Sequence, residues 1–325
     1  MRAREVRIAA TGGPEVLQLV DVELREPGPG EVLMRSTAIG LNFIDTYHRS
    51  GLYPVELPAP LGIEAAGVVE SVGQGVAGLV PGDRVATFGP GRGAYSTARI
   101  VPAAALVRLP DDISDETAAA AMLKGCTAEF LVERCGRVEA GWPVLVHAAA
   151  GGVGLLLVQW LKAVGAVVIG TAGTDSKADL ARAAGADHVL LAGERDLAAR
   201  VRELTEGKGV PVTFDGVGKA TFGVSLDSTA KRGLVVSFGN ASGAVGDIDF
   251  AILARKGSLF ATRPTLFDYY VTPQERQAGT SRLFEMLRAG KLKVTVGQRY
   301  SLEDVRGAHE DLEARRTTGS TLLIP

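Results

Sequence analysis

The fold is decided by the stretch His147-Ala148-Ala149-Ala150-Gly151-Gly152-Val153-Gly154. It follows the apolar run 144–146 and opens the apolar segment 152–164, so it predicts a strand that turns through glycines into a helix. Glycines permit the tight turn and let the backbone approach a pyrophosphate, while the free N–H groups at the helix start attract that anion. The stretch therefore predicts a dinucleotide-binding turn.

Two residues of this stretch leave alternatives open. Ala148 stands where the usual dinucleotide fingerprint has its first glycine, so a glycine-rich turn in a nucleotide-free sheet is the alternative. His147 precedes the turn and is interpreted as a packed strand residue, with a catalytic role as the less favoured alternative.

Beyond the turn, apolar runs alternate with helical patterns. The sequence predicts strands at 167–169, 189–191, 212–214 and 234–238, and helices at 176–184 and 197–204. Ser176 and Asp179 are interpreted as a capping pair for the first of these helices, and Gly185 as its end. Such alternation is typical of a parallel sheet covered by helices on both faces. We therefore expect an α/β fold with a doubly wound parallel sheet.

The chain before the turn has a different pattern. Short alternating runs at 16–20, 31–35, 65–72, 83–88 and 95–101 are separated by Pro and Gly clusters, which is typical of a β-rich sandwich or barrel. An Ala-, Leu- and Glu-rich segment predicts a helix over 114–135. From Ser281 the sequence predicts a helix, a strand near Lys293, a helix over 303–314 and a strand over 321–324. We expect a β-rich unit, an inserted doubly wound unit and a tail that rejoins the first.

The composition is that of an ordinary globular chain of 325 residues, long enough for about two domains. The formal net charge is −2 and no block of like charges occurs, which argues against binding of nucleic acid or an anionic membrane. The two cysteines, Cys126 and Cys135, cannot form a disulfide framework. No apolar run has the length of a signal or a membrane span, so we expect a cytoplasmic protein with no membrane partner.

The end of the second predicted strand distinguishes the two nicotinamide coenzymes. NAD-binding units carry a carboxylate about 20 residues after the glycine turn, where it holds the ribose 2′-hydroxyl. Residues 169–174 contain no acid, whereas Ser176 and Lys177 offer a hydroxyl and an ammonium to a 2′-phosphate. Asp175 is interpreted as a cap of the next helix. The residues favour NADPH, and NADH stays as the alternative.

The residue inventory argues against metal and nucleophilic catalysis. The four histidines, His48, His147, His188 and His309, have no Cys, His or carboxylate at convincing ligand spacing, so no metal site is expected. No nucleophile elbow occurs either. Without a metal or an evident acid, the acceptor must itself be ready for hydride, as quinones and activated enones are.

Landmarks along the whole chain give a more specific indication. They lie at 42–47, 51–54, 123–128, 150–154, 214–218, 237–240, 262–264 and 315–320. With these stretches the chain resembles the zinc-independent quinone oxidoreductases of the medium-chain dehydrogenase/reductase superfamily, which include ζ-crystallin. The resemblance implies a GroES-like catalytic domain at 1–122, a Rossmann NADPH-binding domain at 123–265, a return to the catalytic domain at 266–325, and a homodimer. Zinc-dependent relatives carry Gly-His-Glu where this chain has Gly62-Ile63-Glu64, and an isoleucine cannot ligate a metal.

The same resemblance implies roles for individual residues. Asn42 and Tyr47 are the catalytic candidates, because their amide and phenol would orient an acceptor oxygen and a carboxamide beside the nicotinamide. A structural hydrogen bond at a domain junction is the alternative for both. Further cofactor contacts are implied for Lys124 and Thr127 on the first helix of the nucleotide domain and for Arg315 in the tail.

The remaining implied contacts follow the length of the coenzyme. Gly152 and Val153 would lie under the pyrophosphate, and Gly173, Thr174 and Lys177 would surround the 2′-phosphate. The ribose and nicotinamide side would be lined by Gly216, Val217, Phe238, Gly239 and Asn240. Close bacterial relatives place a tyrosine near the 2′-phosphate where this chain has Ala192, and Arg195 is near enough in sequence to compensate.

Together these observations predict an NADPH-dependent quinone reductase that transfers hydride without zinc to a small-molecule quinone or enone acceptor. An enone or haloacrylate-type ene reductase on the same scaffold is the alternative among enzymes. A non-catalytic NADPH-binding protein of the crystallin type is the alternative outside them. No specific nucleic-acid partner is expected, because basic and aromatic residues do not cluster.

Overall fold

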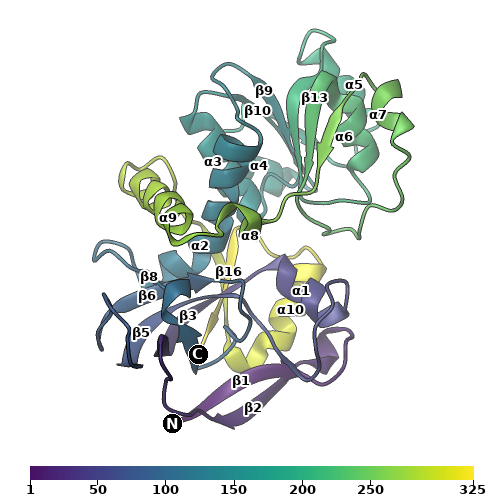
Figure 1. The fold of residues 1–325 in the computed structure, drawn as a ribbon. Coiled ribbons are helices and arrows are strands. Elements are labelled where there is room, and N and C mark those ends of the chain that lie inside the picture. The colour runs from purple at the N-terminus through teal and green to yellow at the C-terminus, as the bar shows by residue number, and fades with distance from the viewer. The chain divides into compact units, whose positions relative to one another are not determined.

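The computed structural model describes residues 1–325 as two compact units (Figure 1). The first unit comprises Met1–Leu123, Thr272–Thr280 and Val294–Pro325, and the second comprises Lys124–Val271 and Ser281–Lys293. The domain limits expected at 122/123 and 265/266 stay a prediction, because compact packing does not test whether each part folds alone.

The second unit contains a six-stranded sheet in the order β11-β10-β9-β12-β13-β14. Its strands are β9 (Pro143–Val146), β10 (Val167–Ala172), β11 (His188–Leu191), β12 (Val210–Asp215), β13 (Thr229–Ser237) and β14 (Phe260–Thr262). Every neighbouring pair is parallel, which confirms the predicted α/β fold with a parallel sheet. The strand order reverses between β9 and β12, and open sheets of this kind bind ligands at the carboxyl ends of the strands beside such a reversal.

The helices of this unit are α3 (Gly152–Ala163), α4 (Asp175–Ala183), α5 (Leu197–Glu203), α6 (Phe222–Ser228), α7 (Ala251–Arg255) and α8 (Leu266–Tyr269). Most of them connect its strands, and α8 follows the last strand. The core lies between them and the central strands, where Leu145 and Trp160 are fully buried. Burial of such apolar side chains is the main stabilising contribution to this layer.

Two predicted helix starts are wrong. The cap of α4 is Thr174, whose hydroxyl accepts the N–H of Lys177 at 3.3 Å, so the pair Ser176 and Asp179 is not the cap. The helix predicted from Ser281 is α9 (Pro273–Arg288), which starts eight residues earlier and belongs to both units. Its true start is a capping box, in which the backbone N–H of Thr272 donates to the Glu275 carboxylate and the backbone N–H of Glu275 donates to the Thr272 hydroxyl.

The first unit contains two sheets. The smaller one has the order β2-β1-β4, formed by β1 (Arg2–Ile8), β2 (Gln18–Glu23) and β4 (Ala59–Pro60). The larger one has the order β15-β16-β3-β5-β6-β8, with β7 paired to β3. It is formed by β3 (Glu31–Leu41), β5 (Glu64–Val72), β6 (Arg84–Phe88), β7 (Ala98–Pro102), β8 (Val107–Arg108), β15 (Val296–Ser301) and β16 (Ser320–Ile324).

The C-terminal tail completes the larger sheet. β16 pairs antiparallel with β3, so that Leu322 lies opposite Gly40. The strand predicted near Lys293 is β15, which begins three residues later. Lys293 itself is not part of the strand, and its backbone N–H donates to the Gln159 side chain at 2.7 Å. The helices α1 (Phe43–Ser50) and α10 (Val305–Glu313) also belong to this unit.

One long helix spans the predicted segment 114–135. It consists of α2 (Asp115–Glu129) followed by a π-helical turn at Phe130–Cys135. Such turns occur often at functional sites. None of the helices in the chain is both long and apolar enough to cross a membrane.

Candidate coenzyme and acceptor site

The predicted dinucleotide turn joins β9 to α3. Ala148 has a left-handed backbone with φ of +53°, the conformation for which the usual fingerprint uses glycine. The neighbouring strand holds this residue in place, because the Thr171 hydroxyl accepts the N–H of Ala148 at 3.3 Å. Gly154 allows close packing, since a Cβ there would lie 2.3 Å from the carbonyl oxygen of Ala148.

The helix start at this turn is suited to an anion. Gly151 is the N-cap of α3 and no side chain caps it, so the first backbone N–H groups of the helix, at Gly152 and Val153, are available to a ligand. His147 lies below the turn, nearly fully buried, with its Nδ1 3.1 Å from the Thr171 hydroxyl. Burial lowers the pKa of His147 below its usual value, as the interpretation as a packed residue requires.

The residues predicted for the 2′-phosphate meet at the carboxyl end of β10. Gly173 and Thr174 follow this strand directly, and Lys177 lies in the first turn of α4. A Cβ at Gly173 would meet open space, so a ligand can approach the backbone there. Ala192 is adjacent, because its N–H donates to the carbonyl oxygen of Ala172 at 2.8 Å. Ala192 offers only a methyl group, and Thr174 and Lys177 are polar side chains that the sequence assigned to this edge.

The residues predicted for the nicotinamide side form two loops, after β12 and after β13. The structure brings the two loops together, since the N–H of Phe238 donates to Asp215 O and that of Ser242 donates to Val217 O, both at 2.8 Å. Asn240 orients its amide so that the oxygen accepts from Arg263 Nη2 at 3.0 Å. Arg263, which also donates to Ser237 O at 2.8 Å, was not assigned to the site from sequence, although it lies in a landmark stretch.

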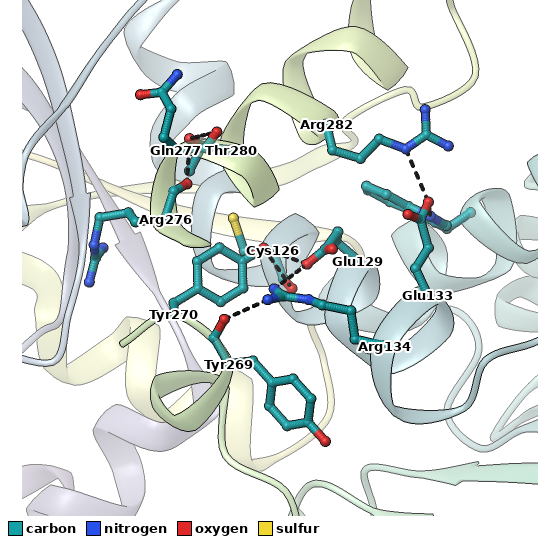
Figure 2. A network of polar contacts seen from close by, with 11 residues as sticks. Cys126, Glu129, Glu133, Arg134, Tyr269, Tyr270, Arg276, Gln277, Thr280 and Arg282 are labelled. Atoms are coloured by element: carbon teal, nitrogen blue, oxygen red, sulfur yellow. Dashed lines mark hydrogen bonds and ion pairs between the residues drawn. The ribbon is translucent and has the colours of Figure 1, made fainter. Parts of the chain in front are cut away.

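Lys124 and Thr127 lie on the part of α2 that belongs to the second unit, and both are buried. The same helix is anchored by the polar network that Figure 2 shows. Glu129 accepts from the Tyr270 hydroxyl at 2.7 Å and from Arg134 at 2.5 Å.

Arg134 lies in the π-helical turn and completes this network. It also donates to Tyr269 O at 2.6 Å, and its guanidinium lies 4.6 Å from the centre of the Tyr270 ring. Burial is the main cause that raises the pKa of Tyr270 far above its usual value, so this phenol stays protonated. Segment 266–270 is thus tied to the helix that carries Lys124 and Thr127.

The catalytic candidates Asn42 and Tyr47 lie in the first unit, at the N-cap and within α1. Asn42 donates from Nδ2 to Glu64 Oε2 at 2.9 Å and to Gly40 O at 3.3 Å. Two acceptors on one side fix the amide, so its oxygen is the atom turned away from Glu64. The Tyr47 ring packs edge-on against Tyr53, with ring centres 5.2 Å apart.

The surroundings of Asn42 do not fit a zinc ion. Glu64 is fully buried and its carboxylate accepts from Asn42 and from the backbone N–H of Leu123, the latter at 2.6 Å. Ile63, directly before Glu64, has an apolar side chain that cannot bind a metal. No group of three or more His, Cys, Asp or Glu side chains in the chain is arranged to hold a metal.

A buried polar chain in the same unit was missed from the sequence. His309 of α10 lies between Arg49, whose Nη1 is 3.0 Å from its Nδ1, and Tyr95, whose hydroxyl is 3.2 Å from its Nε2. The Tyr95 hydroxyl donates to Asp45 at 2.7 Å, and the backbone N–H of Asn42 donates to the same carboxylate at 2.9 Å. This series of hydrogen bonds thereby connects α10 to the N-terminus of α1.

The predicted site residues therefore fall into two sets. Asn42, Tyr47 and Arg315 belong to the first unit, and Arg315 follows α10 with a left-handed φ of +59°. The other predicted residues all belong to the second unit, at the carboxyl ends of its strands or on α2. Their roles toward a ligand stay predictions.

Comparison with known proteins identifies the family of this chain. The family model described as alcohol dehydrogenase GroES-like domain matches residues 28–111, and the one described as zinc-binding dehydrogenase matches residues 152–277. A quinone oxidoreductase of Pseudomonas aeruginosa is 50% identical over 324 residues, which cover 99% of this chain and 100% of that protein. The chain belongs to the quinone oxidoreductase family.

Solved structures of related proteins match nearly the whole length of this chain. The quinone oxidoreductase of Escherichia coli complexed with NADPH has a TM-score of 0.97 and 47% identity, and the match covers 99% of this chain and all of that one. A 2-haloacrylate reductase of a Burkholderia species is 43% identical over 97% of this chain and 96% of that protein. The predicted family, with its GroES-like and Rossmann-type parts, is thus confirmed, and the chain is an oxidoreductase of this family.

Proposed function

We propose that this chain is an NADPH-dependent quinone reductase that works without zinc. The observation that carries the proposal is the carboxyl edge of the parallel sheet. There, the uncapped helix start at Gly152 lies next to the end of β10. This strand is followed by Gly173 and Thr174, and α4 then begins with Asp175 and carries Lys177 in its first turn. A diphosphate and a 2′-phosphate match these two neighbouring features.

The residues of the second unit bind and orient the coenzyme. The N–H groups of Gly152 and Val153 bind the pyrophosphate, and the Lys177 ammonium pairs with the 2′-phosphate. The loops Gly216–Val217 and Phe238–Asn240 hold the ribose and the nicotinamide. Lys124 and Thr127 of the same unit and Arg315 of the first unit add contacts. When bound, NADPH supplies the hydride.

Asn42 and Tyr47 orient the reactants. Because the Asn42 amide N–H groups already serve Glu64 and Gly40, its oxygen accepts a hydrogen bond from a carboxamide N–H or from a hydroxyl. The Tyr47 phenol offers a donor for the acceptor oxygen. The quinone takes up one hydride and one solvent proton and leaves as the hydroquinone.

A second candidate function is the reduction of an activated alkene. The Burkholderia relative is named for a haloacrylate acceptor and shares nearly the whole length of the chain. The same coenzyme geometry serves both reactions, since each needs an electron-poor carbon or carbonyl near the nicotinamide.

We further propose a homodimer and a cytoplasmic location. β14 is an edge strand, Phe260 on it is 65% exposed, and Phe250, directly before α7, is 81% exposed. Large exposed apolar side chains beside an open strand edge favour pairing with a second copy. Neither Cys126 nor Cys135 forms a disulfide, which suits a reducing compartment.

The deciding experiment is a steady-state comparison of NADPH and NADH with a panel of naphthoquinones and enones. We expect kcat/KM to be at least about tenfold higher with NADPH, the factor that one charge-assisted contact supplies, and to be highest with quinones. A preference for enones would support the ene reductase. NADPH binding without oxidation by any acceptor would support the non-catalytic alternative, and a failure to bind NADPH would overturn the proposal.

A further inference from the structure

Asp215 is a fully buried carboxylate at the end of β12 that the proposed function does not use. Its oxygens accept hydrogen bonds of 2.7 to 2.9 Å from four residues, the backbone N–H groups of Val217 and Gly218 and the hydroxyls of Thr221 and Ser225. A buried charge is tolerated only when it is satisfied in this way. All four donors come from the ten residues that follow Asp215, so this carboxylate determines the course of one loop and the start of α6.

The loop after β13 is built onto the first loop. Besides the bonds from Phe238 and Ser242 described above, the N–H of Lys219 donates to Gly243 O at 3.1 Å, and the Ser242 hydroxyl donates to Val217 O at 2.8 Å. The two loops therefore form one unit, residues 216–221 with 238–243, which we name the double loop. A displacement of residues 216–221 must therefore also move residues 238–243.

The double loop has no room for adjustment. A Cβ at Gly216 would lie 2.8 Å from the Phe238 ring, and a Cβ at Gly239 would lie 2.2 Å from Gly216 O. Gly218 has a left-handed φ of +89° and carries one of the N–H groups bound to Asp215. Such tight backbone packing converts a change at the Asp215 carboxylate into a shift of the whole double loop.

We propose that Asp215 is a positioning residue for the nicotinamide half of the coenzyme, acting through the double loop. The inference rests on the proposed function, because that assigns the nicotinamide and its ribose to Gly216–Val217 and Phe238–Asn240. Asp215 acts through the loop and not by a contact with the coenzyme. The proposed function assigns the adenosine half to β10 and α4, whereas the hydrogen-bond donors to the Asp215 side chain lie within residues 216–225, so the carboxylate affects one half of the ligand only.

The test compares two ligands in the full chain. NADPH contains both halves, whereas adenosine 2′,5′-bisphosphate lacks the nicotinamide. In Asp215→Asn, the new amide accepts the two backbone N–H groups and donates to the hydroxyls of Thr221 and Ser225, so the fold is kept with weaker bonds. By calorimetry we expect the Kd of NADPH to rise about tenfold, the Kd of the bisphosphate to change less than about twofold, and kcat to fall about tenfold.

A matched control separates positioning from general destabilisation. Asp187 also accepts a backbone N–H, that of Val168 at 2.7 Å, but it serves the opposite edge of the same sheet. Asp187→Asn should leave the ratio of the two Kd values unchanged. Thr221→Val, which keeps the carboxylate and removes one donor, should change the ratio in the same direction as Asp215→Asn by a smaller factor.

Each outcome decides one question. Equal weakening of both ligands by Asp215→Asn, or no change in either, would overturn the positioning role. If Asp215→Asn does not fold, the Thr221→Val ratio decides, and an unchanged ratio overturns the role. A wild-type chain that binds neither ligand would instead contradict the proposed function itself.

Discussion

Ala148 shows how a single residue can hide a binding turn from its sequence pattern. An alanine in a left-handed conformation costs about 1 kcal/mol relative to glycine. The structure maintains it because Thr171 of the adjacent strand binds the backbone on both sides, accepting the N–H of Ala148 at its hydroxyl and the N–H of Ala149 at its carbonyl. The turn therefore has the geometry of the usual fingerprint without its first glycine.

At the same scale, we propose that Lys177 carries the preference for the phosphorylated coenzyme. Lys177→Ala should raise the KM for NADPH about tenfold and leave the KM for NADH unchanged, because one charge-assisted contact to the 2′-phosphate is lost. Steady-state kinetics with both coenzymes measure this.

The control for Lys177 is Lys208, an exposed lysine of the same unit. Lys208 pairs with Glu206 on the surface, and Lys208→Ala should not affect either coenzyme. If Lys177→Ala raises the KM values for NADPH and NADH equally, Lys177 has a structural role. Arg195 would then be the candidate contact for the 2′-phosphate.

At the scale of elements, β14 is an edge strand that carries an exposed aromatic side chain. It has a neighbour on one side only, β13, and Phe260 on it is exposed. Phe260→Asp should convert the proposed dimer to monomers, since a charge at a paired edge opposes association. Sedimentation velocity over a concentration series measures the change.

Val80 serves as the matched position for this test. Its side chain is 59% exposed in the first unit, so Val80→Asp should not change the sedimentation coefficient. Wild-type sedimentation of Phe260→Asp would show that the edge of β14 is not the interface.

At the scale of the whole molecule, buried histidines make stability depend on pH. Burial, followed by the nearby Arg49, lowers the pKa of His309 from 6.5 to about 3. The hydrogen bonds explain why protonation is unfavourable. Nδ1 must accept from Arg49, and the N–H on Nε2 faces the Tyr95 oxygen, so a proton added at Nδ1 would face another donor.

The sign of the pH effect follows from this lowered pKa. Between pH 6.5 and about 3 the unfolded chain binds a proton that the folded chain does not, so the contribution of His309 is fully present above pH 6.5 and is lost as the pH falls. We expect a slope of about 1.4 kcal/mol per pH unit for each such histidine. Denaturant unfolding between pH 7 and pH 5 measures it.

His309→Gln removes this proton-binding group. The slope should decrease but not vanish, because burial also lowers the pKa values of His48, to about 4, and of His147. An unchanged slope in His309→Gln would show that His309 is already protonated or exposed in the native state.

The sequence by itself determined the parallel sheet, the dinucleotide turn and the family. Apolar periodicity and glycine spacing are local signals, and they act within one element or between neighbours in the chain. Helix starts were less well determined, because a cap such as Thr272 with Glu275 competes with equally plausible polar residues nearby.

Only the tertiary structure decided which polar groups meet. Asn42 lies 22 residues from Glu64, and Arg49 lies 260 residues from His309, yet each pair shares a buried hydrogen bond. No local pattern encodes such partners, because each buried polar side chain is satisfied by whichever group the packing of distant elements brings within bonding distance. The orientation of the Asn42 amide and the pairing of residues 216–221 with 238–243 in the double loop were set at that level, whereas the donors to the Asp215 carboxylate are local in sequence.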